Sequence, residues 1–259
     1  MKAQKLITTL ATSAAILSAN TQASDAIGPG DSESRWILGA SVVAQNNIYA
    51  GEDAVGYISP NFVYNGDRFF VKNGTLNLFV AEVNQFSAGL IVGVDGGYLS
   101  DEDEYEDTDE LEGLIERDAT LEGGFYVNHT TDLGRLNLTV VTDLGNEHDG
   151  ETVSLGYTFD LHAGEWAINP VVKVSWMSDS KVNHHVGVSA SEATATRAEY
   201  RADSAVNVYA GVRGRYEFTE NWDISLETGV TYLDSTIRDS SIVEDDLIYQ
   251  AGVTVSYNF

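Results

Sequence analysis

Long runs of alternating apolar and polar residues fill the second half of the chain. In 206–218 and 222–232 nearly every second side chain is apolar, and those between are polar or small. A period of two places successive side chains on opposite faces of a β-strand. Soluble strands most often have about five or six residues, whereas a tilted strand crossing a bilayer needs about 9 to 11. The length of these runs therefore favours membrane-crossing strands over a soluble β-sandwich.

Aromatic residues stand at the ends of these runs. The pairs are Trp166 with Trp176, Trp222 with Tyr232, and Tyr249 with Phe259. In a soluble sandwich, large aromatic side chains belong in the core, near the middle of a strand. In a membrane barrel they form girdles at the two lipid–water interfaces. The positions thus favour interfacial girdles.

Connections between the runs alternate between short and long. The short ones are 82–85, 130–134, 162–165 and 219–222, and the long ones are 99–117, 145–150, 178–204 and 235–246. A bacterial outer-membrane barrel has short periplasmic turns and long outer loops. The alternation predicts an all-β fold, a transmembrane antiparallel up-and-down β-barrel. Strands near 36–45, 57–64, 68–73 and 75–82 bring the count to 12, with 10 as the fallback because 68–73 is short for a crossing.

The first 23 residues predict a cleavable signal peptide. Lys2 and Lys5 precede an apolar run over 6–17, and small residues lead to Ala23. That run is shorter than the roughly 20 residues of a spanning helix. Residues 24–259 are then one domain, because no linker or composition shift divides them. The chain has no cysteine, so no disulfide can stabilise it.

The chain is strongly acidic. Its formal charge is −26, and removal of 1–23 takes away two lysines and no acid, which leaves −28. Nucleic-acid phosphates would repel such a surface, so we expect no nucleic-acid partner. Nine of the carboxylates fall in 101–112. A divalent-cation site at the lipopolysaccharide surface is one hypothesis, but the spacing does not match an EF-hand loop, and a solvated acidic loop is favoured.

Charged residues on the polar faces of the predicted strands form a candidate site. They are Asp143, Asp160, Lys173, Arg213, Arg215, Glu217, Asp223 and Glu227. The short turn at 219–222 brings both arginines near Asp223 and Glu227. Buried charges persist when paired, so one interpretation is an ion-pair network filling the lumen. The other is a charged constriction that selects a small solute. A barrel of 12 strands lies between filled and open sizes, and we favour a largely filled lumen.

Catalytic and metal-binding signals are weak. The five histidines lack metal-site spacing: His184 and His185 are adjacent, and the other three fall at separate strand ends, so surface histidines are favoured. Ser189 lies in 187–191, which lacks the second glycine of a nucleophile elbow. We therefore expect no enzyme, no cofactor and no metal, with a lipid-acting barrel hydrolase as a minor alternative.

The C-terminus carries a separate signal. Val253, Val255, Tyr257 and Phe259 share the apolar face of the last run. Because a barrel in lipid can leave no edge, the last strand must pair with the first. This ending resembles the terminal signal by which outer-membrane barrels are handed to the barrel-assembly machinery.

Local signatures in order along the mature chain resemble the MipA/OmpV family, whose name refers to an MltA-interacting protein. They are 36–53, 62–78, 111–127, 145–157, 186–193 and 240–259. The resemblance implies an outer-membrane location in contact with lipid and lipopolysaccharide. It also implies a scaffold for a periplasmic lytic transglycosylase and a peptidoglycan synthase. A narrow solute-selective pore and a surface adhesin are the alternatives. The family has no established catalytic motif to transfer to this chain.

Overall fold

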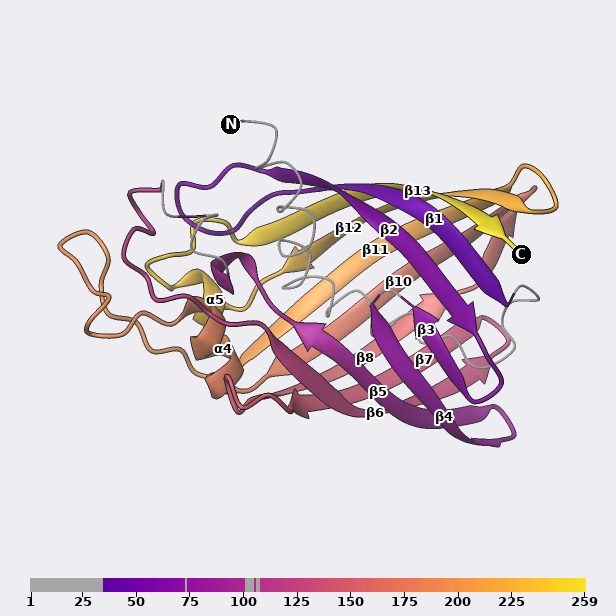
Figure 1. Ribbon diagram of the computed structural model, residues 1–259, viewed down its shortest axis with the longest axis horizontal. Helices are drawn as coiled ribbons and strands as arrows, with labels where there is room; N and C mark the ends of the chain where they lie inside the picture. The colour runs from indigo at the N-terminus through magenta and orange to yellow at the C-terminus, as the bar shows by residue number, and fades with distance from the viewer. Residues whose placement is uncertain (1–34, 73, 101–104, 106–107) are drawn as a thin grey trace.

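The protein forms a closed antiparallel β-barrel, shown as a computed structural model in Figure 1. The structure describes residues 35–72, 74–100, 105 and 108–259. The strands are β1 (Trp36–Gln45), β2 (Val55–Asn65), β3 (Phe69–Lys72), β4 (Thr75–Val83), β5 (Phe86–Asp95), β6 (Thr120–Thr131), β7 (Gly134–Asp143), β8 (Glu151–Phe159), β9 (Leu161–Ala163), β10 (Trp166–Met177), β11 (Ala205–Glu217), β12 (Trp222–Tyr232) and β13 (Leu247–Asn258).

The barrel closes where its first and last strands meet. β13 pairs with β1 from Ile37 opposite Asn258 to Gln45 opposite Gln250. The short strand β9 continues the line of β8 along the same neighbour, β10. The wall therefore has 12 strand positions, which confirms the expected number. The predicted signal peptide, 1–23, lies outside the described residues.

Both prolines of the described chain sit where a strand ladder is interrupted. Pro170 in β10 faces the break at Asp160 that separates β8 from β9. A proline has no N–H to give to a neighbouring strand, so it fits at such a gap. The Asn169 side chain bridges the gap by donating to the Phe159 carbonyl at 3.0 Å. The run expected as one strand over 152–161 is therefore split. Pro60 lies in the part of β2 that pairs with no described residue on the β3 side.

The barrel is apolar outside and polar inside. Val42, Ile58, Leu155, Val174 and Leu226 are exposed on the outer face, whereas Asn77, Asn128, Ser154 and Asn207 are buried in the interior. This reverses the arrangement of a soluble protein and is that of a barrel surrounded by lipid. Near the short turns, Trp222 packs on Tyr257 at 5.1 Å and Trp166 on Tyr216 at 5.3 Å between ring centroids. These pairs lie where the interfacial girdle was expected.

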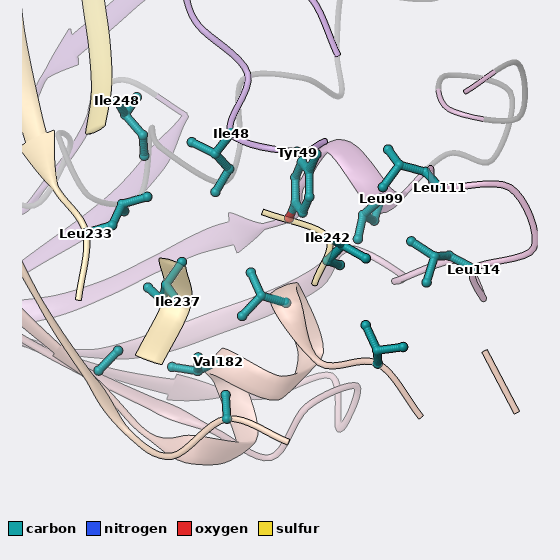
Figure 2. Packing of buried hydrophobic residues seen from close by; sticks show 14 of the residues in the cluster. Ile48, Tyr49, Leu99, Leu111, Leu114, Val182, Leu233, Ile237, Ile242 and Ile248 are labelled. Carbon is teal, nitrogen blue, oxygen red and sulfur yellow. The ribbon is translucent and has the colours of Figure 1, made fainter. Parts of the chain in front are cut away.

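The long loops fold over one end of the barrel, and we call this assembly the cap. It comprises 46–54, 96–119, 178–204 and 233–246, with η2 (Tyr98–Ser100), α4 (Asp179–Val186) and α5 (Ser235–Arg238). Both α-helices lie across the barrel end in Figure 1. Figure 2 shows the buried apolar cluster within the cap, to which all four loops contribute. Its members include Ile48, Tyr49, Leu99, Leu111, Leu114, Val182, Leu233, Ile237 and Ile242.

The cap was not foreseen from the sequence, because 178–204 and 235–246 were expected to be loops only. No helix among the described residues has the length and apolar character needed to span a bilayer.

Candidate functional site beneath the cap

A lysine from the cap reaches into the barrel wall. Lys181 of α4 is buried, and its Nζ lies 2.7 Å from Glu122 Oε1 on β6 and 3.3 Å from Asp95 Oδ2 on β5. A buried charge is stable only when it is paired and hydrogen-bonded. This triad therefore anchors α4 to two neighbouring strands.

Two histidines complete the cluster. His185, one helical turn after Lys181, places its Nε2 3.2 Å from Asp95 Oδ2. His148, from the loop between β7 and β8, has its Nε2 3.5 Å from Asp95 and 3.7 Å from Glu122. Residues four apart on a helix share a face, which is why Lys181 and His185 meet the same carboxylate.

Asp143 holds the loop that presents His148. Its carboxylate accepts four backbone N–H groups, from Gly145, Asn146, His148 and Asp149, at 2.8 to 3.1 Å. The Thr120 hydroxyl adds a fifth bond at 2.6 Å. With these hydrogen bonds made, the Asp143 carboxylate stabilises the turn and is not available to bind a ligand.

The surroundings set the protonation of the helix side chains. Burial would lower the pKa of the Lys181 ammonium, but the Asp95 and Glu122 carboxylates raise it above its usual value. Lys181 is therefore charged at any ordinary pH. Burial first, and the His185 and His148 rings second, lower the pKa of His184 to about 4. His184 is thus a neutral ring at neutral pH.

The trio of Asp95, Glu122 and His148 has the composition of a metal site, with its ligand atoms within 4.8 Å of one another. Two contacts argue against that use. The Lys181 ammonium already occupies the cation position between both carboxylates. The Gly150 N–H donates to His148 Nδ1 at 2.9 Å, so the ring proton belongs on Nε2, the atom a metal would need. The geometry is that of an ion-pair cluster with an ammonium in place of a metal.

A cavity of about 80 Å³ lies between this cluster and the cap. Asp95, Glu122, Lys181 and His185 form its polar side. Its apolar side consists chiefly of Ile48, Ile91, Val141, Met177, Leu233, Ile237 and Ile248. A space of this size holds several water-sized groups. Chemically it offers an apolar surface that ends at a charged, hydrogen-bonding wall.

Asp143 lies beside the cluster, whereas the charged residues predicted on β11 and β12 lie at a different level of the barrel, nearer the short turns. Arg213 Nη2 contacts Glu227 at 2.9 Å, and Arg215 Nη2 contacts Asp223 at 3.1 Å and Glu217 at 3.2 Å. Lys173 is buried one strand away, with its Nζ 5.6 Å from the centroid of the Tyr209 ring. The structure thus brings the arginines and acids together and sets Lys173 apart.

The histidine expectation is wrong for three of the five residues. His148 is buried, and His184 and His185 are half-buried on a helix of the cap rather than exposed at the surface. The reason is that the loops fold back into the barrel mouth. His129 stacks on Phe86 at 4.2 Å near the short turns, and His162 is exposed.

Other sequence candidates show no reactive geometry. The exposed Ser189 hydroxyl bonds to Ser191 at 3.0 Å, and no histidine contacts it among the described residues. In the acidic run 101–112, residues 101–104, 106 and 107 lie outside the described residues, whereas Tyr105 and Leu111 are buried in the cap. Of the terminal residues, Val253, Val255 and Phe259 are exposed on the outer face and Tyr257 is partly so.

Sequence reasoning missed Asp95, Glu122 and Lys181. For Asp95 and Glu122 the available signal was their position in the strands. Asp95 ends an apolar strand at a Gly-Gly pair, and Glu122 stands two residues after an alternation begins. No sequence signal pointed to Lys181, because nothing in 178–204 predicted the helix to which it belongs.

Comparison with known proteins identifies the family. Residues 38–259 match the family described as MltA-interacting protein MipA. The chain belongs to this family. It is 25% identical over 238 residues to outer membrane protein Omp26La of Vibrio anguillarum, covering 88% of each chain. It is 26% identical over 230 residues to OmpV of Vibrio cholerae serotype O1, again with 88% of each covered. It is 21% identical over 235 residues to the MltA-interacting protein of Escherichia coli K12, covering 90% of this chain and 93% of the relative.

The expected resemblance and location are therefore confirmed. This MipA-family protein is an outer-membrane β-barrel, since its relatives are named as outer membrane proteins and its own fold is a closed barrel with an apolar exterior. In such barrels the long loops face outward. The cap of this MipA-family protein accordingly lies on the extracellular side.

Proposed function

We propose that the protein is a non-enzymatic scaffold of the outer membrane that recruits periplasmic murein-remodelling enzymes. One observation carries the proposal: four outer loops pack into one buried apolar cluster at the barrel end, an arrangement that would close an aqueous path through the lumen. The name of the Escherichia coli relative, MltA-interacting protein, supports a lytic transglycosylase as partner. A peptidoglycan synthase would be the second partner.

The recruiting surface would be the periplasmic end. Its short turns include Asp132 and Glu220, both exposed, and the segment 24–34 precedes β1. This platform is small, so recruitment would depend on a few turn residues. The outer loops, by contrast, would face lipopolysaccharide.

Site-specific photocross-linking tests the proposal. A photoreactive residue is placed at Glu220 or Asp132 on the turns, and at Glu199 in the cap as the matched control; all three positions are exposed. We expect adducts with a lytic transglycosylase from the turn positions only, in intact envelopes. Adducts with no murein enzyme at either turn position, in cells that contain the enzymes, would contradict the scaffold.

Insertion would use the C-terminal signal. The Phe259 N–H donates to the Trp36 carbonyl at 3.0 Å, so the last residue also seals the barrel seam. We expect deletion of Phe259 to reduce the folded, heat-modifiable fraction in the outer membrane. Substitution of the exposed, lipid-facing Leu226 by alanine is the control.

A further inference from the structure

Most of strand β2 lacks a neighbour on one side. β1 covers its other side along the whole strand. Toward β3, pairing consists of Tyr64 opposite Val71 and Asn65 opposite Phe70. Residues 55–63 pair with no described residue on that side. In a bilayer, backbone groups at such an edge cannot be left without partners.

The position of Pro60 agrees with this open edge. Asn65 donates its backbone N–H to Arg35 at 2.9 Å, on the β1 side. Because antiparallel strands alternate their bonding direction, Gly56, Ile58, Pro60 and Phe62 direct their backbone groups away from β1. Pro60 has no N–H, so the sequence omits a donor where the strand has no neighbour.

The edge borders an opening in the wall with four described sides. β2 forms one side, and β5 beyond Val92, the last residue that β4 pairs, forms the opposite side. The β3–β4 hairpin, where Lys72 pairs with Thr75, forms the periplasmic side. On the extracellular side the loops 46–54 and 96–119 meet, where the Thr108 hydroxyl donates to the Glu52 carboxylate. We call this feature the side opening.

The cavity beneath the cap reaches the side opening. Thr75 at the hairpin end and Gly93 and Val94 of β5 line the cavity. Val94 is 59% exposed and belongs to the outer, lipid-facing set of β5, whereas its neighbour Asp95 is buried in the ion cluster. The lining of this cavity therefore includes residues at the rim of the side opening, on the hairpin and on β5, as well as the charged cluster, and of the described residues it includes none from β2.

We propose that the side opening admits small amphipathic molecules from the lipid into the cavity beneath the cap. The apolar body of such a ligand lies against Ile91, Leu233 and Ile237. Its single hydroxyl or amine bonds to the Asp95–Glu122–Lys181 cluster, which lines the same cavity. The cavity volume limits the ligand to a short alkyl chain or one small ring. This binding role is independent of murein-enzyme recruitment.

Chemical labelling of a cysteine placed inside the cavity measures the entry of small molecules. Thr139 of β7 is 3% exposed and lines the cavity, and the chain has no native cysteine. Thr139→Cys protein in liposomes is treated with N-ethylmaleimide, which dissolves in lipid, or with a sulfonated maleimide, which does not. We expect labelling by the first reagent and none by the second. Lipid-dissolved 1-heptanol should slow the labelling in a saturable manner.

Variants that fill the side opening test whether small molecules enter the cavity through it. Gly93→Trp adds a ring beside Thr75, whose Cγ2 would lie 3.2 Å from the new Cβ. Thr75→Phe fills the opening from the other side. Val172→Trp, at a lipid-facing position on β10, is the control. Either blocking variant should slow labelling by about tenfold or more, because entry then requires local opening of the wall.

Heat-modifiable gel mobility verifies that each variant is folded. Equal labelling by both reagents, unchanged labelling in a folded Gly93→Trp or Thr75→Phe barrel, or no protection by 1-heptanol would overturn the proposal.

Discussion

At the scale of single residues, Lys181 decides whether α4 stays seated in the barrel. Its ammonium is the hydrogen-bonded cation between the Asp95 and Glu122 carboxylates. Lys181→Met keeps most of the volume but leaves two buried carboxylates facing each other. Breaking a buried pair costs about 3 to 5 kcal/mol, and we expect that loss in the free energy of unfolding in urea.

The double variant Lys181→Met with Glu122→Gln is the matched control. Removing one of the two carboxylate charges should return part of the lost stability, because the cost arises from unpaired charge. A single variant as stable as the wild type would show that the cluster does not hold the helix.

Glu192 gives the cap a dependence on pH. Burial would raise the pKa of its carboxyl, but hydrogen bonds from Ser189 and Ile115, and then Arg117, lower it to about 2. A lowered carboxyl pKa stabilises the folded state above the ordinary value near 4.5. That contribution is lost as the pH falls from about 4.5 toward 2.

Amide hydrogen exchange at Ser189 and Ile115 measures this effect directly, since both N–H groups donate to Glu192 at 2.8 and 3.0 Å. Glu192→Gln should exchange faster than wild type at neutral pH, and the difference should shrink as the pH approaches 2. Asp109→Asn, at an exposed carboxylate in the cap, is the control and should show no such trend. A difference that stays constant with pH would contradict this role.

At the scale of elements, Arg197 joins two cap loops. Its buried guanidinium donates to the carbonyls of Glu110, Glu112 and Glu192 at 2.8 to 3.0 Å. Lysine cannot reproduce that planar set of donors. Each carbonyl left unsatisfied costs about 1 to 3 kcal/mol. Arg197→Lys should therefore speed proteolysis of 108–117 and 187–204 by about tenfold or more, at 1.4 kcal/mol per tenfold.

Arg201→Lys, an exposed substitution in the same loop, is the control for that experiment. Equal cleavage rates in the two variants would mean that the loops are held by their apolar cluster alone.

The strands could be predicted from the sequence, and the cap could not. Alternation in β11, β12 and β13 follows from one face meeting lipid and the other the lumen, so a period of two identifies each strand. The cap depends on contacts between loops far apart in the chain, such as Tyr49 with His185 at 3.2 Å. Short helices like α4 carry too few turns for a clear period. The charge pairs on β11 and β12 were found because one short turn joins those strands, whereas Asp95, Glu122 and Lys181 come from three separate segments.

At the scale of the whole molecule, the structure is a barrel with a polar lumen, a packed extracellular cap and a cavity between them. Ion pairs such as Arg213 with Glu227 occupy the periplasmic half of the lumen, and the cap occupies the other end. A scaffold needs only the barrel and its turns, while a constitutive pore needs a continuous aqueous path. A packed cap therefore agrees with a scaffold and disagrees with a constitutive pore.

Single-channel recording in planar lipid bilayers tests this central claim most directly. The folded wild-type protein should give no stable conductance steps, because a cap packed across the extracellular end would close the aqueous path. In a control variant, a short Gly-Ser linker replaces 188–201 and so removes Arg197 and its contacts. This variant should show a higher conductance, which verifies that the recording detects a loosened cap. Regular, solute-selective steps from the folded wild type would contradict the account and make the protein a pore.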